Sequence, residues 1–455
     1  MTPAHFEDLR SQLSFPDSLV FRVTSEYEKY FSDATTYSGK PAAILFARVK
    51  EDVQAAVKFC QKNKIPLVPR GAGTGLSGGC VASSDSLLLS TELINHIIVN
   101  KPTATAIVGP GAITKTLQDE AAKVGLTYPP DPASFRESTL GGNVAEGAGG
   151  LRCRRFGVTK DYVLGLEAVL ADGSLLRTGV LGNGSGFGLE DLLQASEGTL
   201  GIITEIAFRL IPIPTRGATI LVAFDHPTKA AQTVADITAQ GIIPTVLEFL
   251  DGDAAACSNE YEKNEGLDDA AAILLLETAG QDTTKEIVQI REICERNRCN
   301  YLRGETDPER AESLWNVRRN LSKAIKASAA IRISEDVAVP NTQFPVLVDF
   351  VAKMNLASPL RINAFGHAGD GNLHVNFLSS SGSETDKELI EQGILTLMKK
   401  TVELGGTLTG EHGIGLAKRA YLPLEFDPAT LRAMRGIKQV FDPFNILNPG
   451  KLLPK

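Results

Sequence analysis

Apolar residues between positions 41 and 215 occur in short runs that alternate with amphipathic stretches. The runs AAILFA and IPLVP flank EDVQAAVKFCQKN, in which Val53, Val57 and Cys60 recur at helical spacing. This alternation predicts the strands and helices of an α/β or α+β domain.

The order of the elements changes near Arg216. Strand ATILVAF, helix TKAAQTVADITAQ, strands TVLEFL and AAILLLE, and helix TTKEIVQIREICERN come first, and a second set of the same kind runs from IRISEDV to DKELIEQGILTLMKKTVEL. Two such β-α-β-β-α sets predict one antiparallel sheet with helices packed on a single face. We therefore expect an α+β protein. Its predicted parts are an N-terminal helical segment (1–40), a first domain (41–215), a second domain (216–415) and a C-terminal segment (416–455) that packs back on the first domain.

Composition and charge exclude several classes of protein. The chain has 46 Lys and Arg against 54 Asp and Glu, and no basic run that could follow a phosphate backbone, so nucleic acid is not expected as a partner. Its apolar stretches are far shorter than the ~20 residues of a membrane span. The N-terminus lacks a signal-peptide core, and we expect a cytoplasmic protein, either free or peripherally attached to a membrane.

The six cysteines contain no CxxC pair. In a long chain without a signal peptide they predict neither a disulfide framework nor an iron–sulfur cluster, which needs about four closely arranged thiolates. Any iron–sulfur relay would therefore reside on another chain.

Glycine is concentrated in GAGTGLSGG (71–79), LGGNVAEGAGG (140–150) and LGNGSGFG (181–188). The first cluster follows an apolar strand and offers consecutive backbone N–H groups with little side-chain obstruction, as a pyrophosphate requires. Its spacing is neither the G-x-G-x-x-G of a dinucleotide fold nor the Lys-containing P-loop. A glycine-rich structural turn is the alternative interpretation, and the other two clusters make it less favourable.

The stretch AFGHAGDGNLHVNF (364–377) combines a hairpin signal with two histidines. Asp370-Gly371 predicts a two-residue turn, and pairing outward from this turn places His367 directly opposite His374. Cβ atoms of a directly opposed pair lie about 4.5–5.5 Å apart, close enough for two imidazoles to share one metal ion. We interpret the two histidines as metal ligands; satisfied core or surface histidines are the alternative.

A carboxylate and a third imidazole occur in GEHGIGLAKR (410–419). Adjacent side chains cannot easily both point one way. If Glu411 joins the two histidines, the result is a two-His, one-carboxylate site suited to iron, zinc or manganese, and His412 is free to act as a base. The alternative is a helix cap with an incidental histidine.

The predicted helix through LWNVRRN (314–320) offers an arginine for a substrate carboxylate, which guanidinium binds through two parallel hydrogen bonds. Leu314, Val317 and Leu321 form its apolar stripe, and Arg318 lies beside this stripe. Arg319 competes for the role, and a solvated surface charge is the alternative.

These segments together resemble the FAD-linked oxidases of the vanillyl alcohol oxidase and p-cresol methylhydroxylase superfamily. The narrower resemblance is to the group of the glycolate oxidase catalytic subunit, D-lactate dehydrogenase and D-2-hydroxyglutarate dehydrogenase, from about Pro41 to Lys455. PRGAGTGLSGG is similar to the family's pyrophosphate loop, DPASFRESTLGGNVAEGAGG to its flavin-lining segment, SEGTLGIITEI to the next FAD-contacting strand, and NPGK to the terminal segment that returns to the flavin. Covalent members attach FAD through a histidine in the first loop; this loop has none, which implies noncovalent FAD.

The resemblance implies an FAD-binding domain over residues 41–215, of the two-part p-cresol methylhydroxylase type, and a substrate-binding cap domain over residues 216–415. The FAD-binding residues that it implies are Pro69, Arg70, Gly71, Ala72, Gly73, Thr74, Gly75, Leu76, Ser77, Gly78, Pro130, Asp131, Ser134, Thr139, Gly141, Gly142, Asn143, Ala145, Gly149, Gly150, Glu197, Gly198, Gly201, Ile202, Ile203 and Asn448.

In the same group, GHAGDGNLHVN resembles the metal-binding hairpin, and GEHGIGLAKR resembles the loop with the third ligand and the base. Dicarboxylate-specific members carry a Lys before a strand where this chain reads RISEDVAVP, which favours D-lactate or glycolate over 2-hydroxyglutarate. The resemblance implies His367, His374 and Glu411 as ligands of a divalent metal (zinc, iron or manganese), His412 as the base, and Arg318, His412 and Asn372 as substrate-binding residues.

The implied activity is oxidation of a small D-2-hydroxy acid to the 2-oxo acid, by hydride transfer to flavin N5 with metal-assisted deprotonation of the 2-hydroxyl. Expected partners are the acid and an external electron acceptor, such as an electron-transfer flavoprotein or an iron–sulfur subunit. The alternatives are a D-2-hydroxyglutarate dehydrogenase, a noncatalytic FAD-binding subunit of an oxidase complex, the non-redox alkyl-dihydroxyacetone-phosphate synthase, and a flavin-free metallohydrolase.

Overall fold

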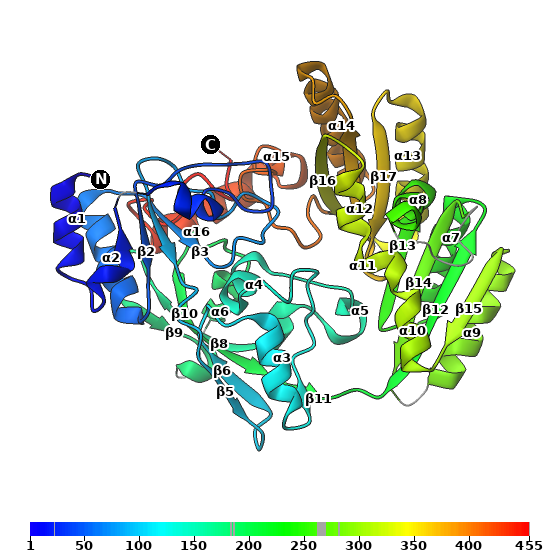
Figure 1. Cartoon of the computed structure of the whole chain (residues 1–455), viewed down its shortest axis with the longest axis horizontal. Helices are drawn as coiled ribbons and strands as arrows, with labels where there is room; N and C mark the ends of the chain where they lie inside the picture. Colours follow the sequence, from blue (N-terminus) through cyan, green and yellow to red (C-terminus); the bar gives the residue numbers. More distant parts are fainter. Residues whose placement is uncertain (22, 183, 185–186, 262–269, 281–282, 455) are drawn as a thin grey trace. The chain divides into compact units, whose positions relative to one another are not determined.

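The chain forms two compact units, and Figure 1 labels most of their helices and strands. The structure is a computed structural model that describes residues 1–21, 23–182, 184, 187–261, 270–280 and 283–454. Unit 1 consists of Met1–Gly150, Gly157–Ile213 and Glu411–Lys455, and unit 2 consists of Leu151–Phe156 and Pro214–Gly410. The return to unit 1 thus occurs at Glu411, whereas the sequence pattern placed it near residue 416.

Unit 1 begins with a small four-stranded sheet. Its elements are α1 (Pro3–Arg10), β1 (Leu19–Val20), β2 (Ala43–Phe46), α2 (Lys50–Asn63), β3 (Leu67–Arg70) and β4 (Leu87–Ser90). The strand order is β1-β2-β4-β3, and the parallel pairing of β2 and β3 with β4 requires crossover connections, of which α2 is one. Helix α2 buries Val53, Val57 and Cys60 in the same core as these strands, as its sequence periodicity predicts.

Unit 1 also contains a five-stranded antiparallel sheet. In spatial order its strands are β5 (Ile97–Asn100), β6 (Thr105–Val108), β10 (Ile202–Arg209), β8 (Val163–Val169) and β9 (Leu175–Arg177), and β7 (Leu126–Thr127) pairs separately with β11 (Ile211–Pro212). The helices of this part are α3 (Thr114–Ala122), α4 (Leu140–Glu146) and α6 (Leu189–Leu193). Tyr128 and Phe208 pack with ring centroids 4.8 Å apart in its core, and burial of each such side chain contributes about 1.5–3 kcal/mol.

The C-terminal segment of unit 1 is hydrogen-bonded to β3, the edge strand of the four-stranded sheet. It contains α15 (Leu422–Glu425) and α16 (Pro428–Phe441). Leu67 N donates to Ile446 O at 2.8 Å, and Asn448 N donates to Leu67 O at 2.7 Å. The Asn448 side-chain amide donates to the carbonyl oxygens of Gly79 (2.9 Å) and Glu197 (2.7 Å). Asn448 therefore joins loops that are far apart in the sequence.

Unit 2 is built on one seven-stranded antiparallel sheet. In spatial order its strands are β15 (Tyr301–Glu305), β12 (Arg216–Phe224), β14 (Ala272–Ala279), β13 (Val246–Asp251), β17 (Arg361–Gly366), β18 (Asn372–Ser379) and β16 (Ile331–Ala338). Strand β13 pairs with β17 and so joins the two β-α-β-β-α sets into one sheet. The antiparallel sheet predicted from these sets is confirmed.

Helices cover both faces of this sheet. The long helices that the sequence predicts lie on one face, where the Phe344 ring packs edge-on to Phe249 at 5.7 Å: α7 (Pro227–Ala239), α9 (Thr283–Arg296), α13 (Phe344–Ala357) and α14 (Glu384–Glu403). Shorter helices pack on Leu250 and Phe365 of the opposite face: α8 (Gly252–Tyr261), α10 (Pro308–Leu314), α11 (Asn316–Arg319) and α12 (Leu321–Ala327). Neighbouring strand residues point to opposite faces, so the prediction of helices on a single face holds for the long helices only.

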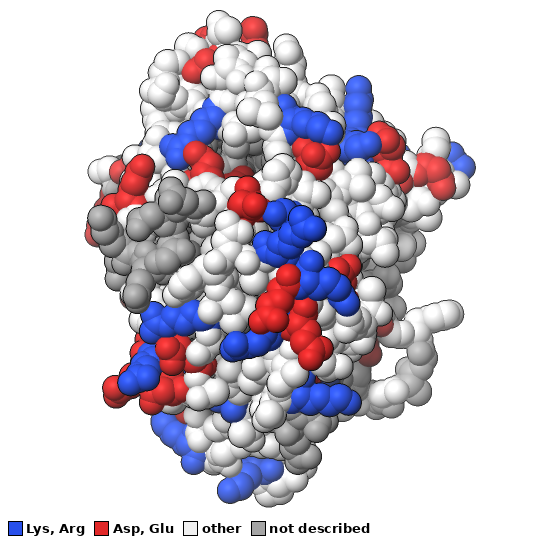
Figure 2. All heavy atoms as spheres, turned by 90° about the vertical axis from the view of Figure 1, so that its right-hand side faces the viewer, with Lys and Arg blue, Asp and Glu red and all other residues white. Residues whose placement is uncertain are grey.

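Charged side chains are spread over the surface. Figure 2 shows Lys and Arg interspersed with Asp and Glu on the face in view, without a continuous basic track. Within the described residues, no helix combines the length and the apolar character needed to span a bilayer.

Candidate active site

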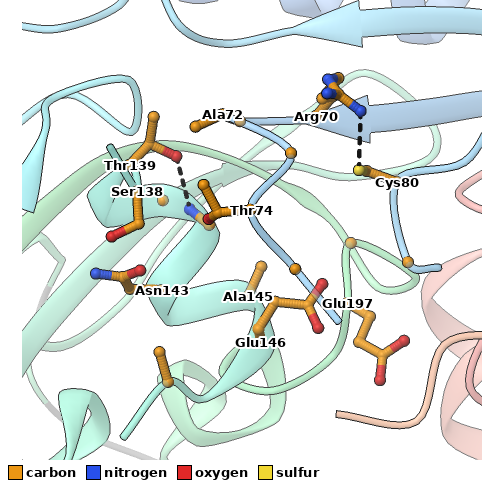
Figure 3. A pocket seen from close by; sticks show the side chains of 18 of the residues that line it. Arg70, Ala72, Thr74, Cys80, Ser138, Thr139, Asn143, Ala145, Glu146 and Glu197 are labelled. Atoms are coloured by element: carbon orange, nitrogen blue, oxygen red, sulfur yellow. Dashed lines mark hydrogen bonds between the residues drawn. The ribbon is translucent and has the colours of Figure 1, made fainter. Parts of the chain in front are cut away.

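The glycine-rich loop after β3 lines a pocket in unit 1 (Figure 3). A side chain at Gly71 would collide with Thr139 Oγ1 at the start of α4. The Arg70 guanidinium is engaged with the protein, because it donates to Ser32 O (2.7 Å) and Cys80 Sγ (3.2 Å). The loop therefore presents backbone to the pocket, as the pyrophosphate interpretation requires.

Most of the predicted FAD-binding residues line this pocket. They are Pro69, Arg70, Gly71, Ala72, Gly73, Thr74, Gly75, Leu76, Ser134, Thr139, Gly141, Gly142, Asn143, Ala145, Gly149, Glu197, Gly198, Gly201, Ile202, Ile203 and Asn448. The lining residues outside the segments that the sequence analysis assigned to FAD are Asp33, Cys80, Thr91 and Pro110. Others lie within those segments but were not named individually: Gly79, Pro132, Ala133, Ser138, Glu146, Ala148 and Ser196.

The other predicted FAD-binding residues, Ser77, Gly78, Pro130, Asp131 and Gly150, are outside the set that lines the pocket in the described part of the chain. Gly78 N donates to the Asp33 carboxylate at 2.8 Å, and Gly150 packs closely on Asp131. Of the third glycine cluster, residues 183, 185 and 186 lie outside the described residues.

Two carboxylates, Glu146 at the end of α4 and Glu197 before β10, lie beneath the glycine-rich loop (Figure 3). Loss of hydration is the main cause that raises both pKa values. The pKa of Glu197 rises to about 7, and that of Glu146 rises well above its usual range, with the charge of Glu197 as the second cause. Glu197 accepts hydrogen bonds from Ile414 N (2.7 Å) and Gly415 N (2.8 Å), so it holds the loop that follows His412.

Glu411 and His412 line the same pocket of unit 1 as the glycine-rich loop. They precede Gly413, whose φ is +83°, a value that glycine adopts without strain. A side chain at Gly413 would lie 2.7 Å from Glu146 Oε2. The glycine therefore lets the chain pass close to the two carboxylates and brings His412 to the wall of the predicted FAD pocket.

The two hairpin histidines lie in unit 2, but not in the predicted register. Phe365, and not His367, is opposite His374. The prediction of direct pairing is wrong because the turn is wider: Ala368–Asp370 form a 3₁₀ turn, and Gly371 follows with φ of +72°. The two rings nevertheless meet, with centroids 5.3 Å apart and planes at 88°, and a ligand nitrogen of one lies within 4.8 Å of a ligand nitrogen of the other.

A carboxylate on β13 links His367 to Arg318. Glu248 is fully buried; its Oε1 lies 2.6 Å from His367 Nδ1, and its Oε2 accepts a hydrogen bond from Arg318 Nε at 2.6 Å. Burial raises the pKa of Glu248, but the charges of His367 and Arg318 outweigh burial and lower this pKa below its usual value. The structure therefore brings together a histidine and an arginine that are well separated in the sequence.

Arg318 and Arg319, the two candidates for the substrate arginine, differ in environment. Arg318 is 9% exposed, and its guanidinium lies 4.9 Å from the ring centroid of Phe365. Arg319 is exposed and pairs with Glu312 on the helix surface. The environment favours Arg318.

Asn372, the predicted substrate residue at the start of β18, is 4% exposed. Within the described part of the chain, neither polar atom of its amide has a hydrogen-bond partner. Gly410 N donates to Asp336 Oδ2 at 2.7 Å, and a side chain at Gly410 would collide with the Asn372 amide. A buried amide without a partner is costly, so Asn372 is a candidate to bind a polar ligand atom.

Comparison with known proteins covers both units. Residues 41–179 match the family described as "FAD binding domain", and residues 213–452 match "FAD linked oxidases, C-terminal domain". The chain belongs to the FAD-linked oxidases. This confirms the resemblance found in the sequence.

Relatives of this FAD-linked oxidase cover nearly its full length. It is 37% identical to "Glycolate oxidase subunit GlcD" of Bacillus subtilis, over 99% of this chain and 97% of the relative. It is 33% identical to "D-lactate dehydrogenase" of Anaerostipes hadrus (94% and 93% covered) and 30% identical to "D-2-hydroxyglutarate dehydrogenase" of Stutzerimonas stutzeri (94% and 93%). The chain is thus an FAD-dependent oxidoreductase of this group.

Solved structures share the fold of this FAD-linked oxidase. Alkyldihydroxyacetonephosphate synthase superposes with a TM-score of 0.77 at 19% identity, covering 99% of this chain and 86% of the synthase. p-Cresol methylhydroxylase superposes with a TM-score of 0.78 at 16% identity, covering 98% and 96%. At these identities the likeness concerns the fold alone, and it confirms the expected two-domain p-cresol methylhydroxylase type.

Two charged residues of this FAD-linked oxidase escaped the sequence analysis. Glu248 is the one carboxylate inside the apolar run TVLEFL, and this isolation is a signal that could have marked it. Arg332 on β16 donates through Nε to Asn376 Oδ1 (2.8 Å) and through Nη1 to Ser322 O (2.9 Å). Burial, and then the charge of Arg318, lower the pKa of Arg332 to about 10.

Proposed function

We propose that this FAD-linked oxidase oxidises a small D-2-hydroxy acid, D-lactate or glycolate, to the 2-oxo acid. The observation that carries the proposal is the buried Arg318–Glu248–His367 cluster with His374 beside it. Such a cluster offers a guanidinium for a carboxylate and imidazoles for a metal within one unit. A hydroxy acid presents both groups that these side chains recognise.

FAD is proposed to bind noncovalently in the pocket of unit 1. The loop from Pro69 to Leu76 supplies backbone for the pyrophosphate, and its side chains include no histidine for a covalent link. When bound, FAD supplies the hydride acceptor. His412 lies on the wall of the same pocket, where a base for the substrate hydroxyl is required.

A divalent metal, zinc, iron or manganese, is proposed to bind His367, His374 and Glu411. The histidines fit this role because both are buried, their ligand nitrogens are close, and His367 is already bonded to a carboxylate, as metal-binding histidines usually are. Glu411 directly follows Gly410, which is bonded to Asp336 of the strand next to His374. A bound metal ion would favour the charged form of the substrate's 2-oxygen.

The substrate residues have distinct proposed roles. Arg318 binds the carboxylate through its Nη atoms, since Glu248 occupies its Nε. The Asn372 amide binds a polar substrate atom, and His412 accepts the proton of the 2-hydroxyl.

A small monocarboxylate fits better than 2-hydroxyglutarate. Arg332 is a half-buried cation that could bind a second carboxylate, but its Nε and Nη1 already donate hydrogen bonds to Asn376 and Ser322. We therefore place D-lactate and glycolate first and D-2-hydroxyglutarate second. Electrons then leave to an external acceptor, such as an electron-transfer flavoprotein or an iron–sulfur subunit, because the chain has no iron–sulfur motif of its own.

The test is anaerobic mixing of the purified protein with D-lactate, L-lactate, glycolate and D-2-hydroxyglutarate, followed through the visible absorbance of the flavin. We expect rapid bleaching by D-lactate or glycolate and none by L-lactate. Bleaching by D-2-hydroxyglutarate alone would establish the second candidate. A yellow protein that none of the acids bleaches would contradict the proposal and favour a noncatalytic FAD subunit, and a colourless protein with bound zinc would favour a metallohydrolase.

A further inference from the structure

We propose that Glu248 is a positioning residue that orients the substrate-binding arginine and a metal-ligating histidine with one carboxylate. The inference rests on the proposed function, since it takes Arg318 and His367 in the roles proposed above. It adds that binding of the acid and binding of the metal depend on the same buried side chain.

The geometry leaves Glu248 little freedom. It lies in β13, which pairs with β14 on one side and β17 on the other. Each of its oxygens has its own partner at 2.6 Å, Arg318 Nε for one and His367 Nδ1 for the other, and the side chain has no exposed surface. Both partners are therefore fixed relative to the centre of one sheet.

The Glu248 carboxylate selects the tautomer of His367 that can bind a metal ion. An ionised carboxylate only accepts hydrogen bonds, and Glu248 already accepts one from the Arg318 guanidinium at 2.6 Å. Nδ1 of His367 must therefore carry the proton in this bond, which puts the lone pair of the ring on Nε2. That tautomer is the one that binds a metal ion.

The same carboxylate fixes the plane of the Arg318 guanidinium. Its Nε is bonded to Glu248, and the Phe365 ring lies against it, with the guanidinium carbon 4.9 Å from the ring centroid. The group is planar, so these two contacts set the direction of the Nη donors. A purely stabilising role explains the arrangement less well, because buried ion pairs rarely stabilise a fold more than apolar residues of the same size.

Glu248→Gln tests these two roles while it keeps the size and packing of the side chain. The amide has the same shape but one acceptor oxygen, so it cannot accept from both partners. We expect roughly a 10–100-fold loss of Zn²⁺ affinity, the range for lost outer partners of metal ligands, together with weaker D-lactate or glycolate binding in flavin reduction. Glu277→Gln on the neighbouring β14 is the matched control, because its carboxylate pairs with Arg152 (3.3 Å) and not with Arg318 or His367.

The measurements use the full-length, FAD-loaded protein, which is stripped of metal by a chelator for the Zn²⁺ titration and reloaded with Zn²⁺ before flavin reduction is followed. Competition with a chromogenic chelator reports the Zn²⁺ affinity, and stopped-flow bleaching reports the acid's apparent Kd separately from the limiting rate. The chain has only six histidines, so ¹⁵N-histidine NMR can follow the Nδ1 proton of His367, assigned with His367→Gln. We expect this proton signal in wild type and Glu277→Gln, and its loss in Glu248→Gln.

Unchanged Zn²⁺ affinity and an unchanged His367 signal in Glu248→Gln would overturn the inference. If circular dichroism shows that this variant does not fold, Glu248→Asp keeps the charge but shortens the reach, and it should weaken the same two readouts; no effect on either would also overturn the inference. A wild type that no hydroxy acid reduces and that binds no Zn²⁺ would refute the proposed function, while the His367 signal would still decide whether Glu248 orients that ring.

Discussion

Arg318 and Arg319 are neighbours in the chain but lie in opposite environments. The first is buried on Glu248, and the second is exposed beside Glu312. We expect Arg318→Lys to raise the KM for the hydroxy acid about 10–100-fold, because an ammonium group cannot hold Glu248 and also present two parallel donors; each lost charged hydrogen bond costs about 1.5–3 kcal/mol. Steady-state kinetics with an artificial electron acceptor measure this effect. Arg319→Lys should stay close to wild type, and an equal effect of both changes would exclude Arg318 as the carboxylate site.

His412 is the second residue whose role is testable alone. His412→Ala should lower the rate of flavin reduction about 10²–10⁴-fold, because it removes the proposed base. The variant should keep the visible FAD spectrum and the Zn²⁺ affinity, since the proposed FAD contacts and metal ligands remain. Near-wild-type turnover would remove His412 from the mechanism.

The turn between β17 and β18 sets the position of both hairpin histidines. Gly371 in this turn has φ of +72°, and a side chain there would collide with Val339 O. Gly405, after α14, has the same φ with nothing within 4 Å among the described residues. Gly405→Ala should cost about 1–2 kcal/mol from the backbone conformation alone, and Gly371→Ala should cost about 1–3 kcal/mol more from the collision. Urea unfolding measures the difference; equal losses would show that the turn tolerates the added methyl group.

The loop after His412 is held to the start of β10 by Glu197. The pKa of Glu197 is raised from 4.5 to about 7, so the folded chain binds this proton more tightly than the unfolded chain. The associated stability is present below about pH 4.5 and is lost as the pH rises through about 7. Glu197→Gln should therefore flatten the fall in the free energy of unfolding of the FAD-free protein between pH 5 and 8. Urea titrations at several pH values test this, and an unchanged slope would count against it.

The pocket of unit 1 is lined by residues from distant parts of the chain. These are the loop from Pro69, helix α4, the start of β10 and Asn448. FAD that binds only the folded state stabilises it by RT ln(1 + [FAD]/Kd), about 2.7 kcal/mol at 100 times Kd. We expect hydrogen exchange to slow in these segments when FAD is added, and much less in the strands of unit 2. Uniform slowing over both units would contradict this assignment of the pocket.

Local patterns in the sequence determined much of the fold. The stripe of Val53, Val57 and Cys60 gave α2, and the two β-α-β-β-α sets gave one antiparallel sheet, because burial follows the period of each element. The glycine-rich loop could also be predicted, because a loop that presents its backbone to a ligand is rich in glycine. Together with the family motifs, these patterns pointed to the FAD-linked oxidases before any contact was known.

The tertiary structure alone decided which polar groups meet. Glu248 and His367 are 119 positions apart, and Glu197 and Ile414 are 217 apart. The width of the turn before His374 likewise depends on how β17 and β18 pair, and not on the Asp-Gly signal within it. Such contacts depend on the order of the strands in the sheet and on where the chain returns to unit 1, and no residue spacing in the sequence reports either. A single carboxylate in an apolar strand becomes a shared partner of an arginine and a histidine only when the sheet forms.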